Sequence, residues 1–177
     1  RKRESKSAKP WYEKGLAIRE KIPDYPEASL AKTYNNLGAV HSDLGLYEEA
    51  ISWQEKALEI RLRLFGEESA EAAMSYNNIG NIHKDKGEFK KGLALHKKAL
   101  EIRQNVLEED DPLIASSLNN VGATYMLSGN EELGIEYYLK ALALRKKIYG
   151  LVHPIVGASY FNIGSVYGQQ EDNIRCL

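Results

Sequence analysis

This sequence of 177 residues lacks the features that mark secreted and membrane proteins. Its one cysteine, Cys176, cannot form a disulfide within the chain, and the first four residues, Arg-Lys-Arg-Glu, lack the apolar core of a signal peptide. No segment approaches the roughly 18 consecutive apolar residues that a transmembrane helix needs. We therefore expect a cytoplasmic protein that does not associate with membranes.

The sequence also lacks an excess of either charge and the motifs of catalytic and metal sites. It has 24 Lys and Arg against 25 Asp and Glu, so we expect no binding to nucleic acid. It contains no glycine-rich phosphate loop, no CxxC and no His-Glu spacing that would form a metal site on one helix face. The four histidines do not cluster, and Cys176 is expected to be inert. We expect no enzyme activity, no cofactor and no metal.

What the sequence does contain is a pentapeptide that returns at a constant interval. Its four copies begin at residues 34, 76, 118 and 160, so each lies 42 residues after the previous one. A fixed period of this size indicates a repeat array, in which each unit is too small to bury its apolar face and stacks on its neighbour. The copies are Tyr34-Asn35-Asn36-Leu37-Gly38, Tyr76-Asn77-Asn78-Ile79-Gly80, Leu118-Asn119-Asn120-Val121-Gly122 and Tyr160-Phe161-Asn162-Ile163-Gly164.

Each pentapeptide belongs to the first helix of a repeat, and a second helix follows it. Ala50, Gln54, Ala57 and Arg61 lie three or four positions apart, which is the helical period, and nothing in the repeat alternates with strand spacing. Glycines at positions 45, 87 and 129 permit the positive φ of a helix C-cap, and the turns are short. The two helices of each repeat must therefore be antiparallel, which predicts an all-α solenoid.

These boundaries divide one domain, 1–177, into repeats. Pro23 and Pro26 lack backbone donors and end a helix, and the next begins near Glu27. The chain begins inside a repeat, so we expect it to be a fragment of a longer protein. We place the second helix of a truncated repeat at 8–22, complete repeats at 27–65, 69–107 and 111–149, and a partial repeat at 153–177 whose second helix begins near Asp172.

A glycine ends every pentapeptide, in the interior of a helix, where it costs roughly 1 kcal/mol relative to alanine. A recurring cost suggests a recurring steric reason. We predict that Gly38, Gly80, Gly122 and Gly164 allow close approach of the second helix, which carries Ala50, Gly92 and Gly134 at the matching positions.

Taken together, these residues resemble the tetratricopeptide repeat. Its pattern of aromatic, Leu-Gly, aromatic or His, and then small residues appears here as Tyr34, Leu37-Gly38, His41, Ala50 and Ala57. The 42-residue length and the phrases Glu-Lys-Ala-Leu-Glu-Ile-Arg and Gly-Leu-Val-His-Pro are similar to the long-repeat branch exemplified by kinesin light chains. The resemblance implies a right-handed superhelix of antiparallel helix pairs, whose concave groove commonly holds extended or helical peptides.

One face of each first helix lies opposite the face that packs on the second helix. With Tyr34 at zero on a helical wheel, Leu37 and His41 fall within about 80°, and the opposite face lies between about 140° and 200°. In the tetratricopeptide family this opposite face lines the groove, so we predict that it binds a peptide. The predicted peptide-binding residues are Lys32, Asn36, Ala39, Asp43, Met74, Asn78, Asn81, Asp85, Ser116, Asn120, Ala123, Leu127, Asn162 and Ser165.

Asparagine is unfavourable inside helices, yet it recurs on this face as Asn36, Asn78, Asn120 and Asn162. A primary amide offers two donors and an acceptor, so it can bracket the N–H and C=O groups of a bound backbone. The alternative is that these amides only bridge adjacent helices. For the flanking residues Asn35, Asn77 and Asn119 we predict hydrogen bonds between repeats.

The charges on this face predict the kind of peptide. The family's clamp for a free carboxylate uses basic residues at these positions, and here only Lys32 matches, whereas Asp43 and Asp85 would repel an acidic tail. We therefore expect a neutral or basic peptide with apolar anchors. Alternatively, Lys84 beside Asp85 forms part of a solvated, partly paired surface.

Two other recurring residue types have structural interpretations. For Arg19, Arg61, Arg103 and Arg145 we predict that the stem covers apolar surface and the guanidinium pairs with a neighbouring Glu or a helix C-terminus, rather than binding an anion. His41 and His83 fall on the side that packs on the second helix, so we expect packed imidazoles.

The sequence thus predicts a protein-binding adaptor or scaffold module that holds a peptide of its partner. One alternative is a structural role, in which the chain forms a homodimer through terminal repeats that expose Trp11 and Phe161. Another is a sensor region that regulates a separate effector domain of a longer protein.

Overall fold

In the computed structural model, the backbone of residues 2–175 and the side chains of residues 4–168 are described, and the described backbone consists of eight helices without a strand. The prediction of an all-α fold is confirmed. The helices are α1 (Lys2–Arg19), α2 (Glu27–Leu44), α3 (Tyr47–Phe65), α4 (Ala70–Asp85), α5 (Phe89–Val106), α6 (Pro112–Leu127), α7 (Glu131–Tyr149) and α8 (Pro154–Arg175).

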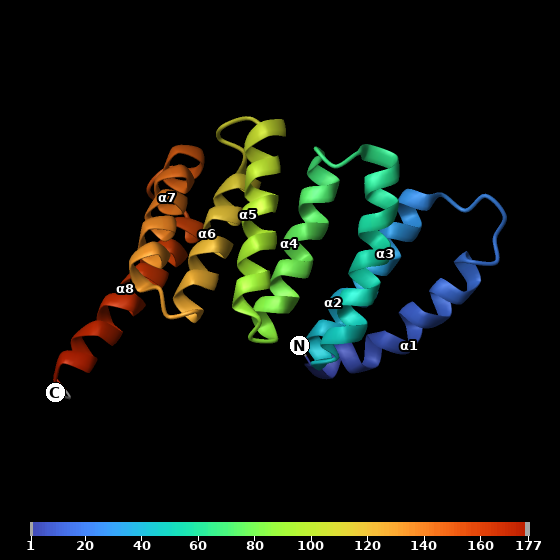
Figure 1. The fold of residues 1–177 in the computed structure, drawn as a ribbon, viewed down its shortest axis with the longest axis horizontal. Coiled ribbons are helices and arrows are strands. Elements are labelled where there is room, and N and C mark those ends of the chain that lie inside the picture. Colours follow the sequence, from blue (N-terminus) through green and yellow to red (C-terminus); the bar gives the residue numbers. More distant parts are fainter. Residues whose placement is uncertain (1, 176–177) are drawn as a thin grey trace. The chain divides into compact units, whose positions relative to one another are not determined.

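The chain forms two compact units, residues 1–102 and residues 103–177, and the boundary falls within α5. In the first unit α1 packs on α2, α2 on α3, and α3 on α4. In the second unit α6 packs on α7, and α7 on α8 (Figure 1). Within each unit these helices therefore pack on their neighbours in the sequence, as expected for stacked helix pairs.

Glycine ends the first helix of each complete repeat, as predicted. Gly45, Gly87 and Gly129 have φ angles of 82°, 88° and 83°, which an L side chain rarely adopts. After each glycine the next N–H reaches back to the last helical turn, for example from Leu46 N to the His41 carbonyl oxygen at 2.9 Å. This hydrogen bond reverses the chain within two residues, so the second helix is antiparallel to the first.

The ends of the chain differ from the prediction in two places. The first helix covers Lys2–Arg19 rather than 8–22. It ends before the predicted residue 22 because Pro23 disfavours helical backbone at the residue before it, and a turn with Asp24 at φ 56° follows. At the other end α8 continues to Arg175 without a break near Asp172, since no proline interrupts its backbone hydrogen bonds. Cys176 lies outside the described residues.

The same apolar contact recurs in two repeats of the first unit. Ala31 and half-buried Tyr34 of α2 pack on Ala57 and Ile60 of α3. One repeat later, Ala73 and Tyr76 of α4 pack on Ala99 and Ile102 of α5. In the second unit Leu142 of α7 packs on Val156 and Ile163 of α8. Small residues on both helices leave room for one large side chain, which fixes the distance between the helices.

Three of the four pentapeptide glycines lie against the second helix, as predicted, and the fourth does not. A Cβ atom on Gly80 would lie 2.6 Å from Cδ2 of His96, and one on Gly122 would lie 2.9 Å from Cδ1 of Tyr138. A Cβ atom on Gly38 would lie 2.7 Å from Nε2 of Gln54. A Cβ atom on Gly164 would meet nothing within 4 Å, because no second helix packs on this face of α8 within the described residues.

Candidate binding surface on the first helices

The predicted binding residues lie on the solvent-facing side of α2, α4, α6 and α8. Each of the fourteen is at least partly exposed, from half-buried Asn78 to Leu127, whose exposed fraction is 56%. Met74 is 38% exposed, which is high for a large apolar side chain in a helix that packs on two others. The helical wheel therefore identified an accessible face on each of these helices.

In the first unit, five of these residues surround one cleft of about 410 Å³ between α2 and α4. Ala39 and Asp43 come from α2, and Asn78, Asn81 and Asp85 come from α4. Lys32, Asn36 and Met74 lie on the same faces but do not line the cleft. The cleft is also lined by Asn35, Ser42, Gln54, Ile82 and Lys84, which the wheel did not assign to this face.

Hydrogen bonds fix the polar wall of this cleft. Gln54 of α3 is 2% exposed, and its Nε2 donates to the Asn35 carbonyl oxygen at 3.0 Å. Nδ2 of Asn78 donates to Oδ1 of Asn35 at 2.7 Å, which joins the two repeats. In the second unit Asn162 donates in the same way to Asn119, at 3.4 Å. The predicted bonding of Asn35 and Asn119 between repeats is confirmed.

Asn78 and Asn162 thus form the inter-repeat bridge that was the alternative to ligand contact. The bridge uses one of the two donors of each amide, so it orients the side chain without exhausting its hydrogen-bonding capacity. Asn36 is exposed on α2. The asparagines on this face therefore differ: Asn78 and Asn162 are held by a neighbouring repeat, and Asn36 projects to solvent.

The cleft carries two carboxylates and one ammonium group. Lys84 Nζ lies 3.6 Å from Oδ1 of Asp85 and donates to Oδ1 of Asn81 at 3.2 Å, so the partial pairing that was the alternative interpretation is present. Asp43 accepts a hydrogen bond from the Ser5 hydroxyl at 2.9 Å. The charges that line the cleft sum to minus one, so a cation is attracted to it more than an anion.

A second, smaller cleft of about 240 Å³ lies in the second unit, between α6, α7 and α8. It brings together Leu127, Asn162 and Ser165 of the predicted set with Met126, Glu131, Tyr138 and Val166. Apolar side chains make up more of this lining than of the first cleft. Ser116, Asn120 and Ala123 lie on the same face of α6 but do not line it.

The recurring arginines do not bond as predicted. Each donates from Nη1 to a hydroxyl 14 residues later, on the first helix of the next repeat: Arg61 to Ser75 at 2.5 Å, Arg103 to Ser117 at 2.6 Å and Arg145 to Ser159 at 2.7 Å. Arg19 bonds Thr33 in the same way. Burial lowers the pKa of Arg61, Arg103 and Arg145. Thr or Ser recurs every 42 residues at positions 33, 75, 117 and 159, and this recurrence was the signal for the pairing.

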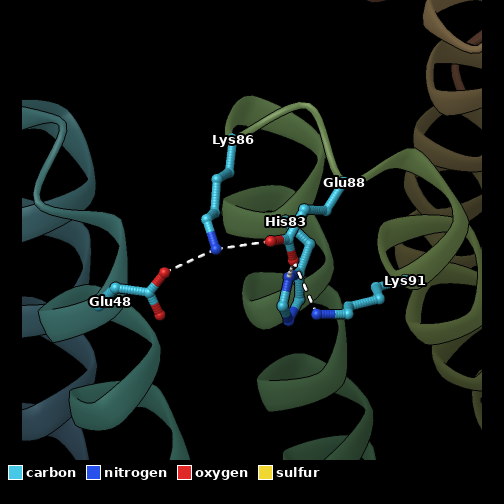
Figure 2. Close-up of polar contacts among 5 residues, drawn as sticks. All are labelled: Glu48, His83, Lys86, Glu88 and Lys91. Atoms are coloured by element: carbon cyan, nitrogen blue, oxygen red, sulfur yellow. Dashed lines mark hydrogen bonds and ion pairs between the residues drawn. The ribbon is translucent and has the colours of Figure 1, made fainter.

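An ion-pair network beside the first cleft links two repeats of the first unit (Figure 2). Lys86 in the turn after α4 contacts Glu48 at 2.6 Å and Glu88 at 2.5 Å, and Glu88 also contacts Lys91 at 3.1 Å. His83 Nδ1 lies 2.8 Å from Oε2 of Glu88, so this imidazole takes part in the network. The expectation that His83 is only packed against the second helix is therefore wrong. Hydrogen bonds from Lys86, Lys91 and His83 lower the pKa of Glu88 to about 2.

His41 fits its prediction better. It is 4% exposed, and its Nδ1 lies 2.8 Å from the Leu37 carbonyl oxygen within the same helix. Its ring also lies 6.2 Å from that of Trp53.

Within residues 4–168, no three His, Cys, Asp or Glu side chains gather in a way that could hold a metal ion. None of the described helices is both long and apolar enough to cross a membrane.

Comparison with known families shows to which protein family the chain belongs. The sequence pattern described as Tetratricopeptide repeat matches residues 29–105, 71–132 and 113–173. The chain belongs to the tetratricopeptide repeat family. Tetratricopeptide repeats generally act in protein–protein interactions and are typically non-catalytic. A search of curated proteins found no significant match.

Several solved structures have the same fold. The structure of BtubC (BKLC) from P. vanneervenii is 25% identical, with a TM-score of 0.79 over 96% of this chain and 67% of that one. A putative kinesin light chain from Podosopora anserina, with nearly identical TPR-like repeats, is 19% identical, with a TM-score of 0.74 over 95% of this chain and 81% of that one. A Rap protein complexed with Competence and Sporulation Factor is 18% identical, with a TM-score of 0.79 over 98% of this chain and 46% of that one. The eight helices thus pack pairwise as in tetratricopeptide solenoids.

Proposed function

We propose that the exposed faces of the first helices bind a segment of a partner protein, and that the cleft between α2 and α4 receives a basic side chain of that segment. The observation that carries the proposal is the cleft itself, where oriented amides lie beside two carboxylates. A Rap protein of the same fold, solved in complex with Competence and Sporulation Factor, provides a precedent for a ligand complex on this fold.

The contacts in the cleft suggest how a peptide would be held. Asn78 and Asn81 place amides on its α4 wall, where they can bracket the backbone of an extended segment. Asp43 and Asp85 offer charge-assisted hydrogen bonds, which are roughly twice as strong as neutral ones. Exposed Met74 on α4 supplies an apolar contact for a neighbouring side chain of the ligand. The surface is preformed, so binding costs little ordering of the protein.

A peptide selection tests the proposed ligand chemistry. A display library of natural protein segments is selected on the purified chain and on the double variant Asp43→Asn, Asp85→Asn. A consensus with a Lys or Arg is expected for the natural chain, with at least about tenfold weaker binding to the variant, since each charge-assisted bond contributes about 1.5–3 kcal/mol. The matched control is Glu59→Gln, Glu101→Gln, which removes two exposed carboxylates from the second helices.

A single substitution tests the role of the amides. Asn36 is exposed, so Asn36→Ala should leave the helical circular dichroism and the stability almost unchanged. It should weaken binding of the selected peptide about two- to tenfold, the range for one hydrogen bond. Equal binding by the natural chain, this variant and the carboxylate double variant would refute the proposed site.

A further inference from the structure

A buried glutamine, Gln54 of α3, forms the floor of the cleft between α2 and α4. Its side chain is 2% exposed, whereas the two carboxylates on the walls, Asp43 and Asp85, are at least partly exposed. Gln54 lies against the pentapeptide glycine of its repeat, since a Cβ atom on Gly38 would lie 2.7 Å from its Nε2 and 2.9 Å from its Cγ. The amide therefore sits between the two helices of the repeat, at the base of the cleft.

One hydrogen bond fixes the orientation of this amide. Nε2 of Gln54 donates to the Asn35 carbonyl oxygen at 3.0 Å, and the reversed amide would place two oxygens against each other. Oε1 therefore lies on the edge of the amide that is turned away from this carbonyl, and among the described residues it has no hydrogen-bond partner. A buried oxygen without a donor is rare and destabilising. Gln54 thus brings to the cleft an acceptor that an N–H group of a ligand can satisfy.

The charges in the cleft decide which kind of donor is favoured. The ammonium group of Lys84 is held on the α4 wall, 3.6 Å from Asp85 and 3.2 Å from Asn81. The lining residues still sum to a charge of minus one, so a cationic donor is attracted more than a neutral amide or hydroxyl. In a protein segment the common cationic donors are the lysine ammonium and the arginine guanidinium.

The spacing of the acceptors distinguishes these two cations. Gly38, which Gln54 covers, precedes Asp43 by five residues, a rise of about 7.5 Å along α2. One ammonium nitrogen bridges two acceptors only when they lie within about 5–6 Å of each other, because each hydrogen bond spans about 2.9 Å. The outer nitrogens of a planar guanidinium diverge, so they bridge acceptors that lie farther apart. Gln54 and Asp43 together therefore favour a guanidinium.

Burial of the acceptor favours the same group. A cation has to lose water to reach Oε1 of Gln54, and a guanidinium is more weakly hydrated than an ammonium. Ala39 of α2 and Ile82 of α4 line the same cleft, so they offer apolar contacts to the methylene stem of an arginine.

We propose that the cleft between α2 and α4 binds an arginine side chain of the partner in preference to lysine, and that Gln54 determines this preference by accepting a hydrogen bond from the guanidinium. The inference rests on the proposed function, because it specifies which basic side chain the cleft receives. At the equivalent position the next two repeats carry His96 and Tyr138, which have no amide oxygen. The preference is therefore assigned to this cleft of the first unit.

Titration with three model peptides, followed by NMR of the side-chain amide groups, tests the inference on the natural chain. The peptides are acetyl-Ala-Ala-Arg-Ala-Ala-amide and its two relatives with lysine or citrulline in place of arginine. Citrulline has the shape of arginine without its charge. The arginine peptide is expected to bind at least about tenfold more tightly than either relative, the effect of one hydrogen bond to a charged group, and to shift the amide signals of Gln54.

A substitution tests the role of the buried amide. Gln54→Met removes the acceptor and keeps a side chain of similar length. It should bind the arginine peptide at least about tenfold more weakly and bind the arginine and lysine peptides equally. Gln104→Met makes the same change at an exposed position of α5 and is the control. Circular dichroism checks the folding of Gln54→Met, and the comparison of the three peptides on the natural chain does not depend on this variant.

Three results would each overturn the inference: equal binding of the arginine and lysine peptides by the natural chain, an arginine preference that persists in Gln54→Met, or no binding of the arginine peptide at millimolar concentration. The proposed function fails separately, if selected peptides bind Asp43→Asn, Asp85→Asn as tightly as the natural chain. Selected peptides that depend on these carboxylates but carry lysine as often as arginine would uphold the proposed function and refute the role of Gln54.

Discussion

The close packing of helix pairs predicts opposite effects of one substitution at two equivalent positions. Gly80 and Gly164 are preceded by the same residues, Asn-Ile, and each lies inside a first helix. Alanine at either position gains the same helix propensity, about 1 kcal/mol relative to glycine. The two sites differ in what the new methyl group meets, so the difference between Gly80→Ala and Gly164→Ala measures packing alone.

The structure supplies the magnitude for each variant. At Gly80 the methyl group would lie 2.6 Å from the fully buried ring of His96 and 3.2 Å from the Gly92 carbonyl oxygen, and neither can move into solvent. Overpacking of this kind costs about 1–3 kcal/mol, and a buried ring favours the upper half of that range. After the gain in propensity, Gly80→Ala should be destabilised by about 1–2 kcal/mol. Gly164→Ala should be stabilised by about 1 kcal/mol, since its methyl group meets nothing.

Urea unfolding of dilute protein, followed by circular dichroism, measures the free energy of unfolding of both variants. Tryptophan fluorescence adds a local reading for Gly80→Ala, because Trp11 and Trp53 both lie in the first unit. If Gly80→Ala were as stable as the natural chain, the steric explanation for the recurring glycine would be wrong.

Two further predictions concern polar contacts between helices. Ser75→Ala leaves the buried Arg61 guanidinium without its hydroxyl acceptor, so the free energy of unfolding in urea should fall by about 1–3 kcal/mol. The control is Ser116→Ala, which should change the free energy of unfolding little because the Ser116 hydroxyl donates within its own helix. The low pKa of Glu88, about 2, means that its carboxylate stabilises the fold above its ordinary pKa of 4.5 and loses this contribution as the pH falls toward 2. The thermal midpoint of Glu88→Gln should therefore lie below that of the natural chain near neutral pH and approach it as the pH falls toward 2. A difference in thermal midpoint that does not change with pH would contradict the stabilising role of the Glu88 carboxylate.

Much of the candidate site was predictable because a helix has a fixed period. Once Tyr34 and Leu37 were placed toward the second helix, residues such as Asn36 and Asp43 had to lie on another face, and the structure leaves them accessible. The bonds of Asn35 and Asn119 followed from their position on the flank between neighbouring repeats. The arginine partners were missed because the sequence shows spacing along one chain, whereas the bond from Arg61 to Ser75 joins two neighbouring helices, α3 and α4.

The sequence by itself determined the repeat length, the helix type and the places where helices reverse, because these depend on residues close together in the chain. The pentapeptide alone gives the repeat length, and glycines such as Gly45 mark where the first helix ends and the chain reverses. Only the tertiary structure decided that Asn78 bridges two repeats, that Gln54 and Lys84 help to line the first cleft, and that Gly164 has open space where Gly80 meets a ring. These features depend on which side chains from separate helices share one volume, and the same residue type has opposite consequences when a neighbouring helix covers it or leaves it exposed.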